Sequence, residues 1–402
     1  MKQYRVIIIG GGASGMFAAT LLGKTLGGGV AVVERNDRVG KKLLATGNGQ
    51  GNIGNRDFSL SHYRGEETLL SAVFSQAPQQ KNLAHLQALG VLSSFDERGR
   101  IYPLSRQASS ALELIRRAYL NSGVEEIVNA EVTAVKPSGK GFIVQTKAGE
   151  FFAEKVVFAA GGKAGNGFGT DGSAFALVRA LGHSVTPLSP SLVALKADTT
   201  YLKNLKGVRM EAALSYRCGK TQLVERGDVL FTDNGVSGDS AFRLSARIPQ
   251  AFPLSCTIEF LPDIEKDALI ALLTEKASAQ TFTALELLVS VVHKQLAKNI
   301  LRALKVAENA PATPAVAKKC AELIKNFPLT VTGTAGFGGA QVTKGGVPAS
   351  EVTLNLESKL QKGLYLCGEA LDVDGDCGGY NLQWAFASAT VAAEEVLKSL
   401  GV

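Results

Sequence analysis

The first 34 residues alternate short apolar runs with a glycine-rich stretch. Residues 5–9 are Arg-Val-Ile-Ile-Ile, a β-branched run typical of a buried parallel strand, and the glycines of residues 10–15 follow directly. Apolar positions at helical spacing come next, and a second apolar run at residues 30–33 ends in Glu34. This order predicts a strand, a tight turn, a helix and a second strand.

The glycine stretch matches G-x-G-x-x-G, with glycines at positions 10, 12 and 15. The first permits a tight turn, the second lets backbone approach a pyrophosphate, and the third lets the helix pack on the strand. The helix N-terminus offers free N–H donors to the phosphates, and Glu34 can accept hydrogen bonds from ribose hydroxyls. A turn without a ligand is the alternative, but the complete order of features favours dinucleotide binding.

Two changes of pattern divide the rest of the chain. Residues 124–162 are rich in strands and turns, which predicts a β-meander that returns to the central sheet. Residues 191–262 again predict short strands, as in a small β-barrel, whereas residues 263–329 predict helices. The predicted fold is α/β, a Rossmann-like domain interrupted by an inserted β-barrel-like and helical domain. Its predicted boundaries are 1–190 with 330–402 for the first domain and 191–329 for the insert.

Composition narrows the class of protein. With 402 residues, 46% apolar and 20% charged, the chain can bury the cores of two or three domains, which excludes disorder and a coiled coil. The net charge of +7 is scattered, without a basic tract that carries aromatics, so we expect no nucleic-acid partner. Five cysteines without a CxxC pair argue against disulfides and zinc and favour a reducing cytoplasm. No uninterrupted apolar run is long enough to predict a membrane span, and the oligomeric state is left open.

The C-terminal segment distinguishes FAD from NAD as the dinucleotide. A short apolar strand ends in Gly368-Glu369, and residues 378–383 open another helix with an apolar stripe. In flavoproteins with such an N-terminal dinucleotide-binding motif, a distant C-terminal segment returns to the flavin. The helix N-terminus can then direct backbone N–H groups at the N1/C2=O edge of the flavin, where charge accumulates on reduction. An ordinary glycine-flanked helix is the alternative.

Short motif blocks in a fixed order extend over most of the chain. They comprise residues 10–15, 39–49, 99–103, 159–163, 169–172, 230–232, 235–238, 343–347, 368–369 and 378–383. In these blocks the chain resembles the BaiN/YhiN-like FAD-binding oxidoreductases, also called aminoacetone-oxidase-like, within the glutathione-reductase-type flavoproteins. The resemblance implies a fold of that type, FAD as cofactor, and an insert that caps the flavin.

Motif and resemblance together predict the residues of the site. The candidates for chemistry are Tyr380 as proton donor or aromatic wall, Cys377 as a thiol beside the flavin, and Asn52. A small residue filling a tight turn is the alternative for Cys377. The predicted FAD-binding residues are Gly10, Gly12, Ala13, Ser14, Gly15, Glu34, Arg35, Lys42, Leu43, Thr46, Gly47, Asn52, Val132, Ala160, Gly161, Gly162, Gly368, Glu369, Gly379, Tyr380, Asn381 and Leu382.

One loop departs from the family pattern. Where the family has Gly-Gly-Arg-Cys-Asn-x-Thr-Asn, residues 48–55 read Asn-Gly-Gln-Gly-Asn-Ile-Gly-Asn. The Arg, Cys and Thr are missing, whereas Asn52 and Asn55 remain. In the family this loop lies close to the isoalloxazine ring, so a role that needs a cation or a thiol there cannot be transferred to this chain.

The remaining polar residues narrow the chemistry. The four histidines form no hydrolase or metal-binding constellation by spacing, so no metal is expected and His183 is expected to be structural. Tyr102 and Arg100 are candidates for lining the pocket, with a surface ion pair as the alternative for Arg100.

Three functions follow from these residues and the resemblance. Only one complete dinucleotide-binding unit is visible, so NAD(P)H would visit the flavin transiently, as a substrate does. The favoured function is a reductase that passes hydride from NAD(P)H through FAD to a small unsaturated or carbonyl substrate. The alternatives are an FAD-dependent oxidase of a small amine such as aminoacetone, and a non-catalytic flavin-binding protein.

Overall fold

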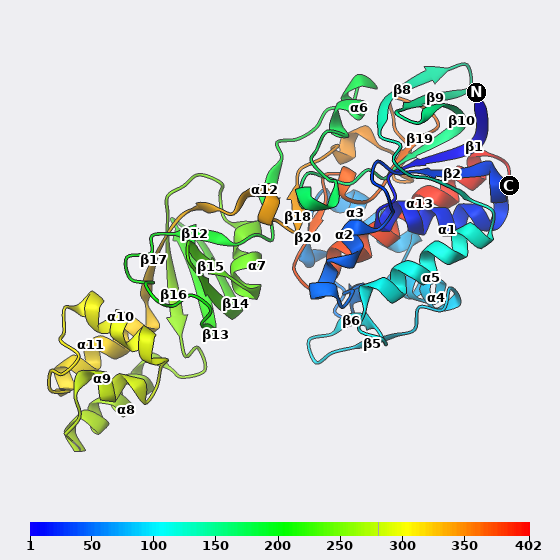
Figure 1. The fold of residues 1–402 in the computed structure, drawn as a ribbon. Helices are drawn as coiled ribbons and strands as arrows, with labels where there is room; N and C mark the ends of the chain where they lie inside the picture. The colour runs from blue at the N-terminus through cyan, green and yellow to red at the C-terminus, as the bar shows by residue number, and fades with distance from the viewer. Residues whose placement is uncertain (280) are drawn as a thin grey trace. The chain divides into compact units, whose positions relative to one another are not determined.

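The computed structural model describes residues 1–279 and 281–402, which divide into two compact units (Figure 1). The first unit comprises Met1–Ser191 and Gln341–Val402, and the second comprises Leu192–Ala340. The predicted boundary at residues 329 and 330 falls inside strand β17 (Phe327–Thr334). Because β17 pairs with two strands of the second unit, that unit extends beyond the predicted boundary.

The first unit is built on a seven-stranded sheet of order β7-β2-β1-β10-β9-β8, with β19 paired to β10. The pairs β7/β2, β2/β1, β1/β10 and β10/β19 are parallel, whereas β8, β9 and β10 form an antiparallel meander. The strands are β1 (Lys2–Ile9), β2 (Val30–Val33), β7 (Glu125–Ile127), β8 (Val132–Ser138), β9 (Gly141–Thr146), β10 (Gly149–Phe158) and β19 (Leu364–Leu366). This arrangement confirms the predicted Rossmann-like α/β fold.

Helices cover this sheet because its central strands are apolar on both faces. All four residues of β2 are buried, as are the last four of β1. Helix α1 (Ala13–Leu26) contacts α5 (Ala108–Asn121) and α13 (Tyr380–Ser399). The blue α1 and the red α13 lie side by side in Figure 1, so the two ends of the chain share one core. Phe17 and Phe386 meet there with ring centroids 4.7 Å apart.

Short elements complete the first unit. Three small sheets join β3 (Gly54–Asn55), β6 (Arg100–Pro103) and β5 (Ser93–Phe95); β4 (Tyr63–Arg64) and β20 (Asp374–Gly375); and β11 (Ser189–Ser191) and β18 (Val342–Lys344). The remaining helices are α2 (Lys41–Leu44), α3 (Glu67–Gln76), α4 (Gln79–Ala88) and α6 (Phe175–Ala180). The pairing of β4 with β20 connects two segments more than 300 residues apart, and it bears on the site below.

The second unit contains a closed barrel of order β12-β15-β14-β13-β16-β17, and most of its helices lie in the chain between the last two barrel strands, β16 and β17. This confirms the predicted β-barrel-like insert. The other strands are β12 (Leu195–Ala197), β13 (Arg209–Cys218), β14 (Thr221–Thr232), β15 (Gly235–Ser237) and β16 (Leu254–Phe260). The helices are α7 (Asp239–Arg247), α8 (Lys266–Ala279), α9 (Ala284–Val289), α10 (Lys294–Leu304), α11 (Pro314–Lys325) and α12 (Gly336–Gly339).

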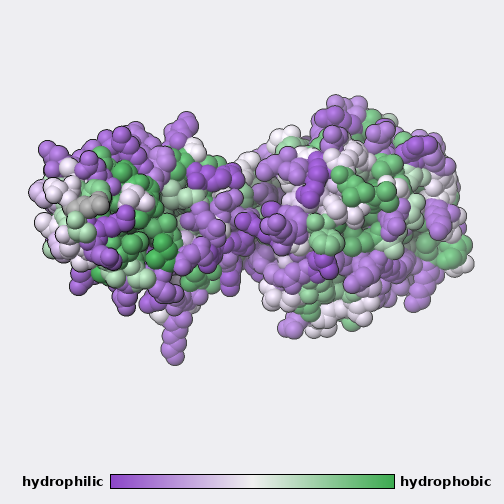
Figure 2. Space-filling model, turned by 90° about the horizontal axis from the view of Figure 1, so that it is seen from below, coloured by the Kyte–Doolittle hydropathy of each residue, from purple (hydrophilic) through white to green (hydrophobic). Residues whose placement is uncertain are grey.

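The surface of each unit is mixed in character. Figure 2 shows hydrophilic residues over much of the visible face of both units, with smaller hydrophobic groups between them. Within residues 1–279 and 281–402, no helix combines the length and apolar character that crossing a bilayer would require. Over the same residues, no cluster of three or more His, Cys, Asp or Glu side chains is arranged to hold a metal ion.

Candidate functional site

Four parallel strands end at one edge of the large sheet, and the predicted site residues follow them. The register pairs Ile9 with both Val33 and Phe158, and Phe158 with Leu366, so β1, β2, β10 and β19 end level. In open α/β sheets, ligands bind in the crevice at the carboxyl ends of the strands. Every predicted FAD-binding residue lies in the first unit, and Gly10–Gly15, Glu34–Arg35, Ala160–Gly162 and Gly368–Glu369 begin within two residues of the ends of these four strands.

The glycine turn after β1 is closely packed at Gly10 and Gly15 and open at Gly12. A Cβ atom on Gly10, whose φ is +104°, would lie 2.5 Å from the Ala159 carbonyl oxygen, and one on Gly15 would lie 1.9 Å from the Gly10 carbonyl oxygen. Backbone therefore fills the space at these two positions. A Cβ on Gly12, the N-cap of α1, would meet no atom within 4 Å, and no side chain caps the helix. The space beside Gly12 is thus open and the first N–H groups of α1 have no side-chain cap, which fits an anionic group at this helix end.

The Glu34 carboxylate holds this turn in place and keeps an acceptor position. Its Oε2 accepts the Gly11 N–H at 2.8 Å, and its Oε1 accepts the Asn36 backbone and side-chain N–H groups at 2.8 and 2.7 Å. Two carboxylate oxygens offer about four acceptor positions, so one remains on Oε2 for a ribose hydroxyl. The neighbouring Arg35 is instead paired with Asp171 at 2.9 Å and Glu131 at 3.2 Å, next to the predicted adenine neighbour Val132.

Three distant parts of the chain meet at Glu369. Its carboxylate pairs with Lys42 Nζ at 2.7 Å and accepts the Thr343 N–H at 2.8 Å. A Cβ on Gly162 would lie 2.4 Å from Thr343 Oγ1 and 2.7 Å from Glu369 Oε1, so only glycine fits there. Leu43, Thr46 and Gly47 follow Lys42, and the Thr46 hydroxyl donates to the Leu43 carbonyl at 2.7 Å. The structure thus brings together residues that the sequence analysis assigned to one site.

The C-terminal segment contacts α1 directly. A Cβ on Gly368, whose φ is +68°, would lie 2.6 Å from Ser14 Oγ, and the Gly368 carbonyl accepts the Trp384 indole N–H at 3.0 Å. Burial raises the pKa of the adjacent Cys367 thiol to about 12, which keeps it protonated and unreactive.

The turn before α13 contains two buried polar groups without a partner. A Cβ on Gly379, whose φ is +105°, would lie 2.3 Å from the Gly54 carbonyl oxygen and 2.6 Å from Asn52 Oδ1. Asn52 Oδ1 and Gln383 Nε2 are both buried, and neither makes a hydrogen bond to the described residues. Buried groups of this kind are costly unless a ligand or water satisfies them. An acceptor and a donor beside the N-terminus of α13 therefore fit a polar ring edge such as that of a flavin.

The candidates for chemistry differ in their surroundings. Tyr380 is 4% exposed, and its hydroxyl donates to the Asp57 carbonyl at 3.1 Å. Burial raises the pKa of the Tyr380 phenol, so it stays neutral and its proton is directed at the main chain. Cys377 is partly exposed just before the two glycines, and Asn381 instead binds the Gly375 N–H and carbonyl at 2.8 Å each. The catalytic roles of Tyr380, Cys377 and Asn52 remain predictions.

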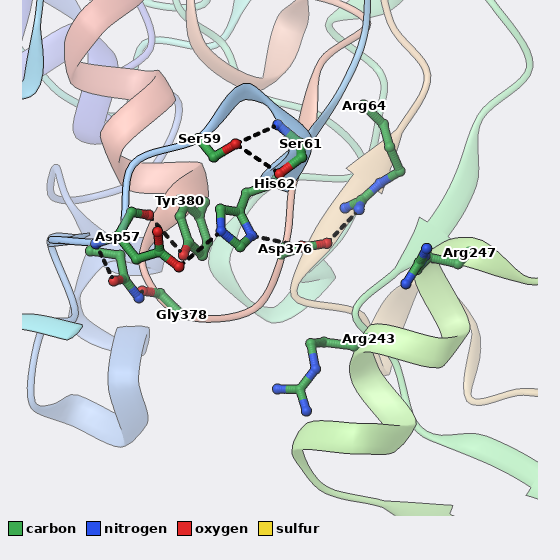
Figure 3. A network of polar contacts seen from close by, with 12 residues as sticks. Asp57, Ser59, Ser61, His62, Arg64, Arg243, Arg247, Asp376, Gly378 and Tyr380 are labelled. Carbon is green, nitrogen blue, oxygen red and sulfur yellow. Dashed lines mark hydrogen bonds and ion pairs between the residues drawn. The ribbon is translucent and has the colours of Figure 1, made fainter. Parts of the chain in front are cut away.

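A polar network beside this turn was not predicted. Figure 3 shows His62 between Asp57 and Asp376, with Arg64 on the far side of Asp376. The His62 Nδ1 and Nε2 atoms lie 3.2 Å from Asp376 Oδ2 and 3.3 Å from Asp57 Oδ2. Arg64 pairs with Asp376 at 2.6 Å and with the buried Asp374 at 2.8 Å. Burial raises the pKa of Asp374, and Arg64 opposes that shift. The alternation of Asp372, Asp374 and Asp376 was the available signal, but the partners of Asp374 and Asp376 at residues 62 and 64 lie in no recognised motif.

The surroundings of Arg100, Gln50 and Gly51 bear on what the sequence predicts for these positions. Arg100 Nε lies 2.8 Å from Asp96 Oδ2, in agreement with the surface ion pair and not with a free pocket residue. Gly51 has a φ of +75°, and a Cβ there would lie 2.9 Å from the Ala108 Cα atom, whereas Gln50 is exposed.

This geometry gives different expectations for the two lost family residues. We expect Gln50→Arg to leave FAD content and stability unchanged, because its side chain is exposed. Gly51→Cys should lower the free energy of unfolding by at least about 1–2 kcal/mol, since it combines a left-handed backbone with a backbone clash. Denaturant unfolding, followed by the fluorescence of the single tryptophan, Trp384, measures the stability of both variants. Equal stability of the two variants would contradict the placement of this loop.

His183 is buried in a bridge between two segments. Its Nδ1 lies 2.7 Å from Glu351 Oε2, and its Nε2 lies 2.8 Å from Ser358 Oγ. The order Ser-His-Glu matches that of a hydrolase triad. However, Ser358 Oγ also accepts the backbone N–H groups of Leu360 and Gln361, at 3.1 and 2.8 Å, which occupies its lone pairs. The bridge is therefore structural.

Removal of this imidazole should destabilise the first unit. We expect His183→Ala to lower the free energy of unfolding by about 2–3 kcal/mol, because it leaves buried polar groups without partners. Trp384 fluorescence in a denaturant series measures this, because that side chain is buried in the same unit. His293→Ala, which removes an exposed cap of α10, should cost no more than about 1 kcal/mol. Equal losses in both variants would refute a structural bridge.

Comparison with known proteins agrees with this architecture. The sequence model of one family, described as "HI0933-like protein Rossmann domain", matches residues 4–395. The chain is 36% identical to a 3-dehydro-bile acid delta(4,6)-reductase of Clostridium scindens, over 96% of this chain and 98% of that protein. It is 27% identical to a ribosomal RNA dihydrouridine synthase of Haemophilus influenzae, over 98% of both chains. Among solved structures, a mutant E. coli quinol fumarate reductase FrdA is similar in fold, with a TM-score of 0.51 at 14% identity, covering 100% of this chain and 71% of that one.

Proposed function

Since the chain belongs to the HI0933-like Rossmann-domain family and is an FAD-dependent oxidoreductase, we propose that it reduces a carbon–carbon double bond conjugated to a carbonyl group. The proposed substrate is a small molecule. NAD(P)H is the proposed source of hydride, and it reaches the flavin transiently because the sequence contains one complete dinucleotide-binding unit.

The observation that carries this proposal is the 36% identity to a reductase along nearly the whole chain. In a 3-dehydro bile acid with Δ4,6 unsaturation, the double bonds are conjugated to the 3-oxo group. Dihydrouridine is uridine whose ring double bond, conjugated to a carbonyl, has been saturated. The two kinds of relative therefore act on different molecules that share one type of bond, and this shared bond supports the proposed chemistry.

The residues of the chain have separate parts in this function. When bound, FAD supplies the hydride transfer. The open N-terminus of α1 and the spare acceptor on Glu34 would hold its diphosphate and ribose. The Lys42–Glu369 pair joins helix α2 to the C-terminal segment. The N-terminus of α13, after Gly379, would stabilise the negative charge that develops on the pyrimidine edge of the ring during reduction.

A small molecule is favoured over RNA by identity and by charge. The chain is 36% identical to the bile acid reductase and 27% identical to the H. influenzae dihydrouridine synthase. Many of its basic side chains are engaged in ion pairs, for example Arg116 with Glu126 at 2.8 Å and Lys41 with Asp37 at 2.7 Å. Neutralised cations contribute little to binding of a polyanion.

Anaerobic mixing of the holoprotein with candidate donors tests the proposal. NADH or NADPH should bleach the oxidised flavin band, and a 3-oxo-Δ4,6 bile acid should then restore it while losing one double bond. Aminoacetone, the amine of the alternative oxidase reaction, should not bleach the flavin. The proposal fails if the amine bleaches the flavin and neither nicotinamide does. Restoration by unmodified ribosomal RNA, but by no enone, would refute the small-molecule substrate.

A further inference from the structure

We propose that His62 is a positioning residue that neutralises the carboxylates beside the Gly378–Tyr380 turn and thereby sets how readily the bound flavin accepts electrons. This inference rests on the proposed function, because it concerns the edge of FAD that the turn is predicted to face. It assigns a role to a histidine that no sequence motif contains.

The two ring nitrogens of His62 both face carboxylates. Nδ1 lies 3.2 Å from Asp376 Oδ2, and Nε2 lies 3.3 Å from Asp57 Oδ2 (Figure 3). Neutral imidazole carries one N–H group, so it can donate to only one of the two carboxylates. The geometry therefore fits the doubly protonated imidazolium, which places a positive charge between Asp57 and Asp376.

Several contacts hold the His62 side chain close to the Gly378–Tyr380 turn. The His62 ring stacks on the Tyr380 ring with centroids 4.3 Å apart and an interplanar angle of 19°. The Asp376 N–H donates to the His62 carbonyl at 2.8 Å, and the Asn55 side chain donates to the Gly378 carbonyl at 3.2 Å. Residues 55–64 and 374–380 are thus held together, so the field of His62 acts on the start of α13 from a fixed position.

The balance of charge in the network depends on His62. Three carboxylates, those of Asp57, Asp374 and Asp376, face the two cations His62 and Arg64. Without the imidazolium, the opposing cations are Arg64 and, toward Asp374, Lys344. The Asp57 side chain is 73% exposed and screened by solvent, whereas that of Asp376 is 19% exposed, so Asp376 carries most of the effect.

This charge matters because reduction adds negative charge to the flavin. The N-terminus of α13 stabilises that charge, and an unneutralised carboxylate in the preceding turn would oppose it. Loss of the His62 charge should therefore make reduction less favourable, and loss of the Asp376 charge should make it more favourable.

A double-mutant cycle on the FAD-loaded protein tests this. Each variant is equilibrated anaerobically with dithionite and a reference dye, and the ratio of reduced to oxidised flavin is read at a fixed dye ratio. We expect His62→Gln to lower that ratio by about tenfold, as for one partly buried charge interaction. Asp376→Asn should raise it, and the double variant should return to within about threefold of the wild type. His293→Gln, in the second unit, should change nothing.

The FAD content of each variant separates the outcomes. With FAD content unchanged, an unaltered ratio in His62→Gln, or a double variant that does not recover, would overturn the inference. A purely structural role predicts additive losses and no recovery. If His62→Gln does not fold, Asp376→Asn alone decides, since a rise supports the inference and a fall or no change overturns it. A wild-type protein without FAD would overturn the proposed function itself, whereas failure of the enone assay would leave this cycle intact.

Discussion

Gly12→Val should fold like the wild type and fail to bind FAD. A Cβ at this position would meet no atom of the protein within 4 Å, so the substitution should change the free energy of unfolding by no more than about 1 kcal/mol. The new side chain would occupy the space at the N-terminus of α1 where the diphosphate is predicted to lie. We expect FAD affinity to fall by at least about 100-fold, which is ~2.7 kcal/mol.

The measurement pairs FAD titration of the apoprotein with denaturant unfolding. Gly28→Val is the matched control, because Gly28 lies beyond the other end of α1 and a Cβ there would be in ordinary contact at 3.7 Å. It should keep wild-type FAD affinity. Wild-type affinity in Gly12→Val would show that the diphosphate lies elsewhere.

Glu34→Ala should lose both stability and FAD. The substitution leaves the Gly11 and Asn36 N–H groups without their acceptor, which should cost about 2–3 kcal/mol of unfolding free energy. It also removes the predicted acceptor for the ribose, so FAD affinity should fall by roughly tenfold to 100-fold, as for loss of one or two hydrogen bonds to a charged group.

Glu34→Gln separates the two effects. The amide oxygen can still accept either the Gly11 N–H or the Asn36 N–H groups, but not both sets, so stability should recover only in part, whereas loss of the negative charge should keep FAD binding weak. Retention of wild-type FAD content in the alanine variant would refute the ribose role of Glu34.

Local patterns in the sequence predicted the strands, helix and glycine turn that position the site. The β1, α1 and β2 segments follow from apolar periodicity and glycine spacing, and Glu34 from its place at a strand end. Glu369 and the turn before α13 were found because short motifs mark them. Within the segment 263–329, which was predicted to be helical, α9 and α10 are two separate helices, because Thr283 and His293 each cap one of them.

Contacts between segments that are far apart in the sequence could not be predicted from local patterns. Arg64 and Asp374 are 310 positions apart, and no periodicity or motif connects them. Likewise, Thr343 lies within a recognised block, yet its hydrogen bonds to Lys163 and Ala164 appear only in the folded chain. The predicted boundary at 329 and 330 was wrong for the same reason, because the pairing of β17 with the barrel is a tertiary contact.

The FAD content of the purified wild-type protein tests the central claim most directly. If the ends of β1, β2, β10 and β19 and the start of α13 build one cofactor site, the yellow protein should carry, or take up, one FAD per chain. That FAD should be lost from Gly12→Val and retained in Gly28→Val. A folded wild-type chain that is colourless and takes up no added FAD would contradict the account.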